Sequence, residues 1–305
     1  MSEPLVVEVT RSGAVESTHL VDAAVVDRQG ALVAWAGDAE RAAAFRSSAK
    51  PIQARIAREA GWEPADTRAL AIASASHSGS PEHVEAVRAV LDAAGLDERA
   101  LGCPAALPLD ADAARHVSGP APVLHNCSGK HAAMLAACVA AGWDLATYRA
   151  PEHPLQQRIR ARLGDLLGGI GPPLVDGCGV PTCVAPLAAF ARAFGSVEAP
   201  ETDAMRAHPV LVGGEGRVDT TLMQAVPRLV AKGGAEALLC LAVGSFAVAL
   251  KVRDGSPRAV GPAALVLLSE LGIEVPDDAA AILTPPVLGG GMVVGSVSAR
   301  GTLSR

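Results

Sequence analysis

The chain has 305 residues, of which 50% are hydrophobic and 19% charged, with a net charge of −6 and an isoelectric point near 5.8. This composition excludes a disordered or collagen-like chain, and the acidic balance with 3% aromatic residues argues against a nucleic-acid surface. The length suits a large hydrophobic core, so we expect a single domain over residues 1–305 that acts on a small molecule.

The N-terminus carries no targeting pattern, because Met1–Pro4 lacks a basic segment followed by an apolar stretch, so no secretory signal is expected. The longest nearly apolar run, residues 237–250, is too short to cross a bilayer. We therefore expect a cytoplasmic protein without a membrane partner, whose six cysteines are free, metal-bound or catalytic rather than paired in disulfides.

The first elements expected along the chain are strands. Leu5–Val9 and Ala23–Trp35 have alternating or β-branched sequences typical of strands, with turn residues at 12–13 and 28–30. A helix is expected to begin near Ser47, because the proline that follows a few residues later is tolerated only in a first turn.

Residues 70–76 form a short apolar run that predicts a buried strand. A helix should follow through residue 94, because Ser80, Pro81 and Glu82 provide an N-cap, an N1 proline and a first-turn acid.

The remainder of the chain predicts mixed structure, with helices near 129–141, 152–167 and 181–194 and strands at 237–252 and 292–302. Strands at both ends with helices between them predict an α/β (α+β) fold. The chain contains no glycine motif of a nucleotide-binding loop, which argues against a doubly wound dinucleotide-binding fold.

Lysine is scarce, since only Lys50, Lys130, Lys232 and Lys251 are lysines among the 26 basic residues. A lysine can lose its proton when it is desolvated or lies near positive charge, whereas an arginine cannot. A position that holds lysine in this chain is therefore a candidate for acid–base or metal chemistry. Lys232 lies in a sequence typical of a loop, and for this residue we expect no function.

Ser47 and Lys50 form a Ser-x-x-Lys motif at the expected start of a helix, where the two side chains share a face. The unpaired N–H groups and the positive dipole end of a first turn disfavour an ammonium, so a neutral Lys50 is attainable as a base for the Ser47 hydroxyl. Acyl-transfer enzymes use this arrangement. The spacing also arises by chance, so the motif alone leaves both interpretations open.

Residues 74–80 alternate serines with other residues around His77, at the end of the predicted strand. Strand ends beside glycine turns are where α/β sites are built, which makes Ser76 a candidate hydroxyl. The alternative is a helix cap with a hydrogen-bonded turn, in which His77 is a scaffold rather than a base.

Cys127 and Lys130 lie at the start of an expected helix, and Asp176 and Cys178 lie in a glycine-flanked string. Two thiols, an amine and a carboxylate could make a soft metal site, for which zinc is the default. Buried structural cysteines are the alternative, because the spacing matches no standard zinc motif. Lys251 follows a strongly apolar strand and points either to solvent or to a function.

Six strings, taken in order, closely resemble the asparaginase II family of the rhizobial type, and the match extends along the chain. They are residues 46–51, 75–79, 125–131, 176–182, 213–217 and 234–236. The resemblance implies a fold similar to serine β-lactamases and penicillin-binding proteins, with an antiparallel-rich sheet and flanking helices. It also implies hydrolysis of L-asparagine to L-aspartate and ammonia by a homodimer.

The same resemblance implies the site residues. Two Ser–Lys pairs would be catalytic: Ser47 with Lys50, and Ser76 with Lys251. Zinc would be held beside them and would position the substrate; its implied ligands are Cys127, Lys130 and Cys178. Substrate contacts are expected from Arg46, His77 and Asp176. Some family members carry a further cysteine beside the zinc where this chain has Ala237, and the nearby Cys240 is displaced from that position.

In the expected reaction, neutral Lys50 deprotonates Ser47, which attacks the side-chain carboxamide to form a β-aspartyl ester that water then hydrolyses. Two alternatives stay open. A β-lactamase-like serine acylase or peptidase is disfavoured by the absence of S-D-N and K-T-G strings. The other is a non-catalytic protein that binds zinc or an amino acid.

Overall fold

The computed structural model describes residues 2–305. The chain divides into two compact units, one formed by residues 2–48, 185–196 and 221–305, the other by Ala49–Val184 and Val197–Thr220. Helix α10 (Val218–Ala225) carries the chain from the second unit to the first.

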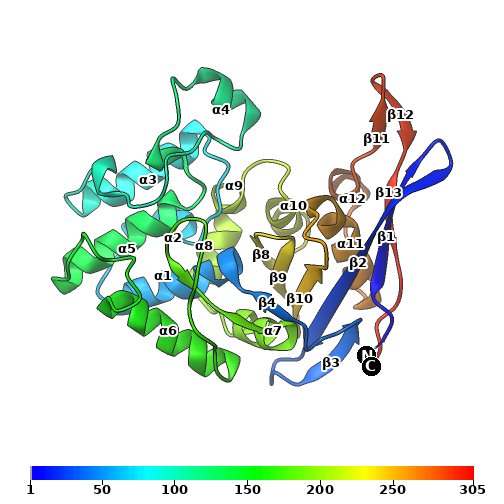
Figure 1. Ribbon diagram of the computed structural model, residues 1–305, viewed down its shortest axis with the longest axis horizontal. Coiled ribbons are helices and arrows are strands. Elements are labelled where there is room, and N and C mark those ends of the chain that lie inside the picture. The colour runs from blue at the N-terminus through cyan, green and yellow to red at the C-terminus, as the bar shows by residue number, and fades with distance from the viewer. Residues whose placement is uncertain (1) are drawn as a thin grey trace. The chain divides into compact units, whose positions relative to one another are not determined.

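The first unit is built on an antiparallel sheet with the strand order β13-β1-β2-β10-β9-β8, to which β3 adds on β2 (Figure 1). The strands are β1 (Leu5–Arg11), β2 (Ala14–Val26), β3 (Leu32–Ala36), β8 (Val230–Gly234), β9 (Leu238–Val243), β10 (Phe246–Val252) and β13 (Val297–Arg300). The N-terminal and C-terminal strands pair with each other, with Val7 opposite Ala299. This arrangement confirms the predicted mixed α/β class with an antiparallel-rich sheet.

A two-residue turn at Ser12 and Gly13 joins β1 to β2, with φ of 48° and 85°. Positive φ at both central residues matches the right-handed twist of a hairpin, and glycine adopts it without strain. The turn residues predicted at 12–13 are therefore confirmed.

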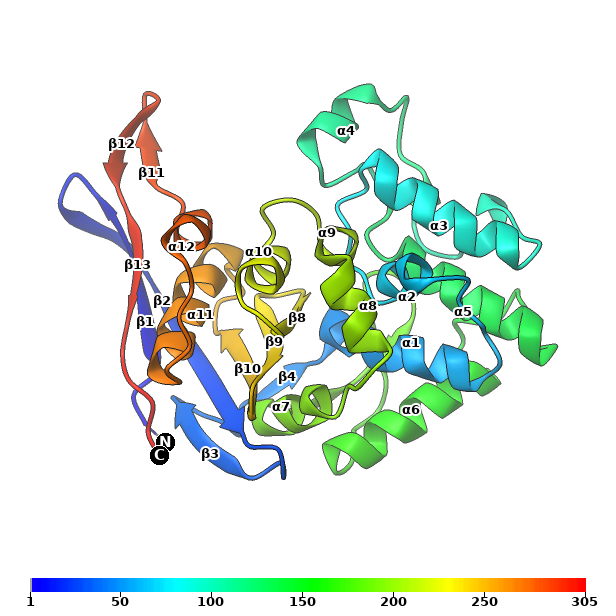
Figure 2. The same ribbon diagram turned by 180° about the vertical axis from the view of Figure 1, so that it is seen from behind.

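Two helices of the first unit, α7 (Leu187–Gly195) and α11 (Val260–Glu270), both pack against β10, and α11 also contacts β1 and β13 (Figure 2). Four consecutive buried residues, Ala247–Leu250, show that both faces of β10 are covered. The unit also contains η4 (Pro257–Ala259), α12 (Asp277–Leu283), β4 (Ala42–Ala44) and the hairpin β11 (Val287–Gly289) with β12 (Met292–Gly295), while β7 (Val184–Pro186) leads the chain into it.

The second unit is helical and centres on α5 (Ser128–Ala141), which contacts α1, α2 and α3 (Figure 1). Residues 128–138 of α5 are all buried, so this helix is surrounded by others. The remaining α-helices are α1 (Lys50–Glu59), α2 (Thr67–Ala73), α3 (Pro81–Ala93), α4 (Ala111–His116), α6 (Pro154–Leu167), α8 (Glu201–Ala207) and α9 (Pro209–Val212), with the 3₁₀ turns η2 (Glu98–Ala100) and η3 (Pro122–Leu124).

Close contact between α5 and α2 depends on Gly129. A Cβ atom at this position would lie 2.2 Å from the carbonyl oxygen of Ile72, so only glycine allows the two backbones to approach this closely. This contact holds the first turn of α5 against the end of α2. The short hairpin of β5 (Leu174–Val175) and β6 (Pro181–Thr182) completes the unit, and its turn carries Asp176 and Cys178.

Residues 70–76 and 181–194 differ from the secondary structure expected from the sequence. Residues 70–76 contain no strand, because α2 begins after Asp66, whose carboxylate accepts the N–H of Ala69 at 2.8 Å. Its residues 69–73 are all buried, and a short apolar run without periodicity cannot distinguish a buried helix from a strand. The segment 181–194 is helical only from Leu187.

No helix in the part of the chain from residue 2 onward is long and apolar enough to cross a membrane.

Candidate functional site

Lys50 is the first residue of α1, directly after a 3₁₀ turn, η1 (Arg46–Ala49). Pro51 occupies the first turn of the helix, where its missing N–H costs no hydrogen bond. The sequence placed a helix start near Ser47, and the structure confirms it. Lys50 belongs to the second unit, and its side chain is completely buried there.

The Lys50 amine lies among three oxygen atoms of the second unit. Its Nζ is 2.5 Å from the carbonyl oxygen of Ala75, 3.3 Å from that of Asn126 and 2.9 Å from the hydroxyl oxygen of Ser76. The two carbonyls can only accept hydrogen bonds, whereas the hydroxyl can accept or donate.

Burial lowers the pKa of Lys50, the charge of Lys130 lowers it further, and the charge of Cys127 opposes this shift. A neutral Lys50 has two N–H groups, which would go to Ala75 and Asn126. Its lone pair would then face the Ser76 hydroxyl, which would donate. The arrangement suits transfer of a proton from Ser76 to Lys50.

His77 is completely buried beside Ser76, and both of its ring nitrogens have protein partners. The N–H of Gly79 donates to Nδ1 at 3.1 Å, and Nε2 lies 2.8 Å from the hydroxyl oxygen of Ser128. Burial, and then the neighbouring His83, hold the pKa of His77 well below its usual range. Burial therefore favours the neutral form of the ring.

Ser47 and Arg46 belong to the first unit. Arg46 has a φ of 47°, a left-handed conformation that is uncommon for a residue with a side chain and that occurs often at functional sites. Ser47 is buried except for 9% of its surface. The predicted pairing of Ser47 with Lys50 stays a prediction.

Cys127 and Cys178 are both buried free thiols. A hydrogen bond with Cys178 is the main cause that holds the pKa of Cys127 well below its ordinary value. Burial acts in the opposite direction and raises the pKa, whereas the charges of Lys50 and Lys130 lower it further. The same hydrogen bond and burial raise the pKa of Cys178. Cys127 is therefore the thiol of the pair that ionises first.

Lys130 is nearly fully buried, and its Nζ lies 3.1 Å from the sulfur of Cys178. Burial lowers the pKa of Lys130, but the charges of Cys178, Cys127 and Asp176 outweigh it, so that its pKa is raised. Asp176 lies in the β5–β6 turn and accepts the N–H of Gly177 at 2.8 Å. The predicted zinc ligands and Asp176 thus come together in the second unit.

This group of side chains fits a soft divalent metal. Two buried thiols within hydrogen-bonding distance, one of them poised to ionise, match the preference of zinc for thiolate, and Lys130 would have to give up its proton to coordinate. Among residues 2–305, no three His, Cys, Asp or Glu side chains gather as a metal site, so the fit depends on the amine as third ligand.

The two remaining lysines both lie in strands of the first unit. Lys251 lies in β10, is only partly buried, and donates to the carbonyl oxygen of Val252 at 2.5 Å; burial lowers its pKa. Lys232 is not in a loop: it lies in β8, is completely buried, and donates to the carbonyl of Gly233 at 2.8 Å. The glycines that follow Lys232 led to the prediction of a loop, and this prediction is wrong.

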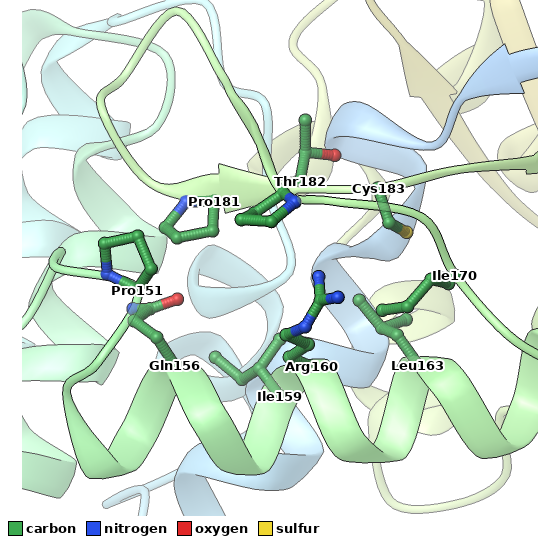
Figure 3. Close-up of a pocket in the computed structure, with 10 residues that line it drawn as sticks. Pro151, Gln156, Ile159, Arg160, Leu163, Ile170, Pro181, Thr182 and Cys183 are labelled. Carbon is green, nitrogen blue, oxygen red and sulfur yellow. The ribbon is translucent and has the colours of Figure 1, made fainter.

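A cavity lies between α6 and β6, with the side chains of Gln156 and Arg160 directed toward it (Figure 3). Its volume of about 20 Å³ holds about one water molecule.

The sequence model of one family, described as L-asparaginase II, matches residues 7–299. A search of the curated proteins finds no match to this chain. The match covers nearly all of both units and confirms the family that the six sequence strings indicated. The chain belongs to the L-asparaginase II family.

Proposed function

We propose that this protein hydrolyses L-asparagine to L-aspartate and ammonia through a serine ester, on a fold related to serine β-lactamases. Membership of the L-asparaginase II family supports asparagine amidohydrolase activity in general. The observation that supports the serine mechanism is the buried amine of Lys50, which has two carbonyl acceptors and the Ser76 hydroxyl around it.

In the proposed first half-reaction, neutral Lys50 takes a proton from a serine hydroxyl, whose oxygen attacks the side-chain carboxamide carbon of asparagine. Backbone N–H groups at the start of α1 would stabilise the oxyanion. The C–N bond then breaks while the Lys50 ammonium returns its proton to the leaving amine. Ammonia and a β-aspartyl ester are formed.

In the second half-reaction, Lys50 takes a proton from water, whose oxygen attacks the ester carbonyl. The ester bond breaks, the serine oxygen regains the proton, and aspartate leaves. Lys50 thus acts as base and acid in each half, which requires a pKa below that of an exposed lysine, in the direction that its burial produces.

Ser47 is the expected nucleophile, with Ser76 as a proton relay. The hydrogen bond between Lys50 and Ser76, at 2.9 Å, supports Ser76 as the hydroxyl that Lys50 deprotonates, and makes Ser76 a second candidate nucleophile. The proposed substrate contacts of Arg46, His77 and Asp176 are expectations from the family resemblance.

Cys127, Lys130 and Cys178 are the proposed zinc ligands. Zinc held there would polarise and orient a substrate carboxylate or carbonyl rather than generate hydroxide, because the serine already supplies the nucleophile. We also propose a homodimer and a cytoplasmic location, both of which follow from the sequence expectations alone.

Trapping of the ester tests the proposal. The protein is mixed with L-asparagine, quenched in acid within milliseconds and digested, and the peptides that carry residues 47 and 76 are weighed. An aspartyl adduct on one serine identifies the nucleophile, and its loss in the matching Ser→Ala variant confirms the assignment. Ammonia release without any adduct, unchanged in both variants, contradicts the serine mechanism.

The second catalytic lysine is tested by Lys232→Met and Lys251→Met. We expect the larger loss of kcat for Lys251→Met, because the family resemblance pairs Lys251 with Ser76 and burial lowers its pKa, whereas Lys232→Met serves as the control at a buried lysine for which no function is expected. A larger loss in Lys251→Met supports the assignment that the family resemblance implies.

A further inference from the structure

His77 follows directly after Ser76 in the turn between α2 and α3. Its Nδ1 accepts the N–H of Gly79, so the proton of the neutral ring lies on Nε2. Nε2–H then donates to the hydroxyl oxygen of Ser128 at 2.8 Å, and the Ser128 hydroxyl donates to the carbonyl of Val123 at 2.8 Å. This chain of hydrogen bonds fixes the tautomer and the orientation of the ring.

The ring is held on its face as well. His83 stacks on His77, with 5.1 Å between the ring centroids and 17° between the planes. His83 is fixed in turn, since its Nδ1 accepts the N–H of Ser80 at 3.2 Å and its Nε2 donates to the carbonyl of Val210 at 2.8 Å. His77 therefore has no unused polar atom to offer to a substrate and no freedom to turn toward one.

The partner of His77 connects two parts of the site. Ser128 is the first residue of α5, directly after Cys127 and two residues before Lys130. Ser76, on the other side of His77, makes the hydrogen bond with Lys50, and its own N–H donates to the carbonyl of Val212 at 2.9 Å. One imidazole thus ties the Ser76 turn to the first turn of α5.

We propose that His77 is a positioning residue that holds the Ser76 hydroxyl on Lys50 by anchoring the Ser76 turn to Ser128, and that it does not bind substrate. This inference deepens the proposed function and rests on it. It replaces the substrate contact that the family resemblance suggested for His77. A small displacement of a reacting group can cost about 100-fold in rate, so a loss of this anchor should appear in kcat.

Two replacements of His77 each keep one of the two hydrogen bonds of the ring and remove the other. In His77→Gln, the amide nitrogen lies near the position of Nε2 and can still donate to Ser128. In His77→Asn, the amide oxygen can still accept the N–H of Gly79, but the side chain is too short to reach Ser128. We expect kcat to fall by about 30- to 100-fold in His77→Asn and by less than 10-fold in His77→Gln, with KM within threefold of wild type in both.

Ser128→Ala removes the other partner of the same hydrogen bond with a smaller change, and it remains informative if a His77 variant fails to fold. We expect Ser128→Ala to lower kcat as His77→Asn does, and the double variant to lose no more than about threefold beyond the worse single variant, because both remove one contact.

His153 provides a matched control in the same unit. It is also buried, its Nδ1 accepts the N–H of the residue two positions later, Leu155, at 3.2 Å, and its Nε2 donates to the backbone carbonyl of Asp144 at 3.1 Å. His153→Asn should lower the melting temperature as His77→Asn does and leave kcat and KM of the folded protein unchanged.

Steady-state ammonia release from L-asparagine gives kcat and KM for all variants. A rise in KM at constant kcat in His77→Asn would show a substrate contact and overturn the inference. Wild-type kcat in both His77→Asn and Ser128→Ala would show a purely structural role and overturn it too, as would equal losses in His77→Asn and His77→Gln. If the wild-type protein itself releases no ammonia, the proposed function fails instead.

Discussion

The clearest prediction concerns Lys50→Met, which removes the buried amine while keeping nearly the same side-chain length and volume. The carbonyls of Ala75 and Asn126 lose their donors, which costs about 1–3 kcal/mol for each acceptor left without a partner. The mutation also removes the free-energy cost of burying the Lys50 amine, and this gain offsets part of the cost of the unpaired carbonyls. We therefore expect a free energy of unfolding within about 2 kcal/mol of the wild-type value.

Activity should change far more than stability in Lys50→Met. Loss of a general base lowers kcat by about 100- to 10,000-fold, which ammonia release from L-asparagine measures while urea denaturation gives the stability. Lys50→Arg is the matched control, because arginine keeps a positive charge but cannot become neutral. Both variants should be inactive. A kcat within threefold of wild type in Lys50→Met, or an active Lys50→Arg, would refute the role of Lys50 as a base.

Other predictions concern pH, stability and metal. Burial lowers the pKa of Lys50, so kcat should rise with pH through a value below the ordinary 10.5 of lysine; a pH–rate profile checks this. Burial raises the pKa of Asp22, but hydrogen bonds from Arg253 outweigh it, so the pKa is lowered in the folded protein. The ionised carboxylate therefore stabilises the fold above its unfolded pKa, and Asp22→Asn should lower the free energy of unfolding by about 2 kcal/mol at pH 7, as measured by urea denaturation. This difference should vanish as the pH falls through the folded pKa. Gly129→Ala should lower the melting temperature because of its contact with α2, whereas Gly164→Ala, with no atom closer than 3.9 Å, should raise stability by about 0.5–1 kcal/mol. Cys178→Ser should lose zinc measured by elemental mass spectrometry, and zinc content equal to wild type would contradict the ligand assignment.

Local sequence signals predicted much of the fold. The hairpin turn at residues 12–13, the cap and proline that begin α3, and the helix start near Lys50 all follow from chemistry within four residues of each position. The segment 70–76 could not be assigned in this way, because α2 is buried on all sides and so has no amphipathic pattern. Its state depends on packing against other helices, which a local pattern does not contain.

The sequence singled out residues that the structure brings together, but it did not predict the hydrogen bond between Lys50 and Ser76, and the pairing of Ser47 with Lys50 stays a prediction. Scarcity of lysine identified Lys50 and Lys130, which the structure brings together with Cys127 and Cys178. Sequence spacing joined Lys50 to the serine three residues earlier, whereas the structure gives its amine a hydrogen bond to Ser76, which is distant along the chain. Spacing describes only neighbours on one helix, and the helices that surround α5 decide which distant hydroxyl a buried amine reaches.

The burial of Lys232 shows the limit of the same reasoning. Glycines after a lysine are typical of a loop, yet Lys232 lies in an ordered strand, and at Gly234 a Cβ atom would lie 2.9 Å from the hydroxyl oxygen of Ser48. The glycine serves close packing rather than flexibility.

Ammonia release from L-asparagine by the catalytic variants tests the serine–lysine mechanism. Wild type, Ser47→Ala, Ser76→Ala and Lys50→Met are each incubated with L-asparagine and L-glutamine, and zinc content is measured on the same samples. We predict that the wild-type protein releases ammonia from asparagine and that Lys50→Met and at least one serine variant lose about 100-fold or more in kcat. Wild-type turnover in Lys50→Met and both serine variants would contradict it.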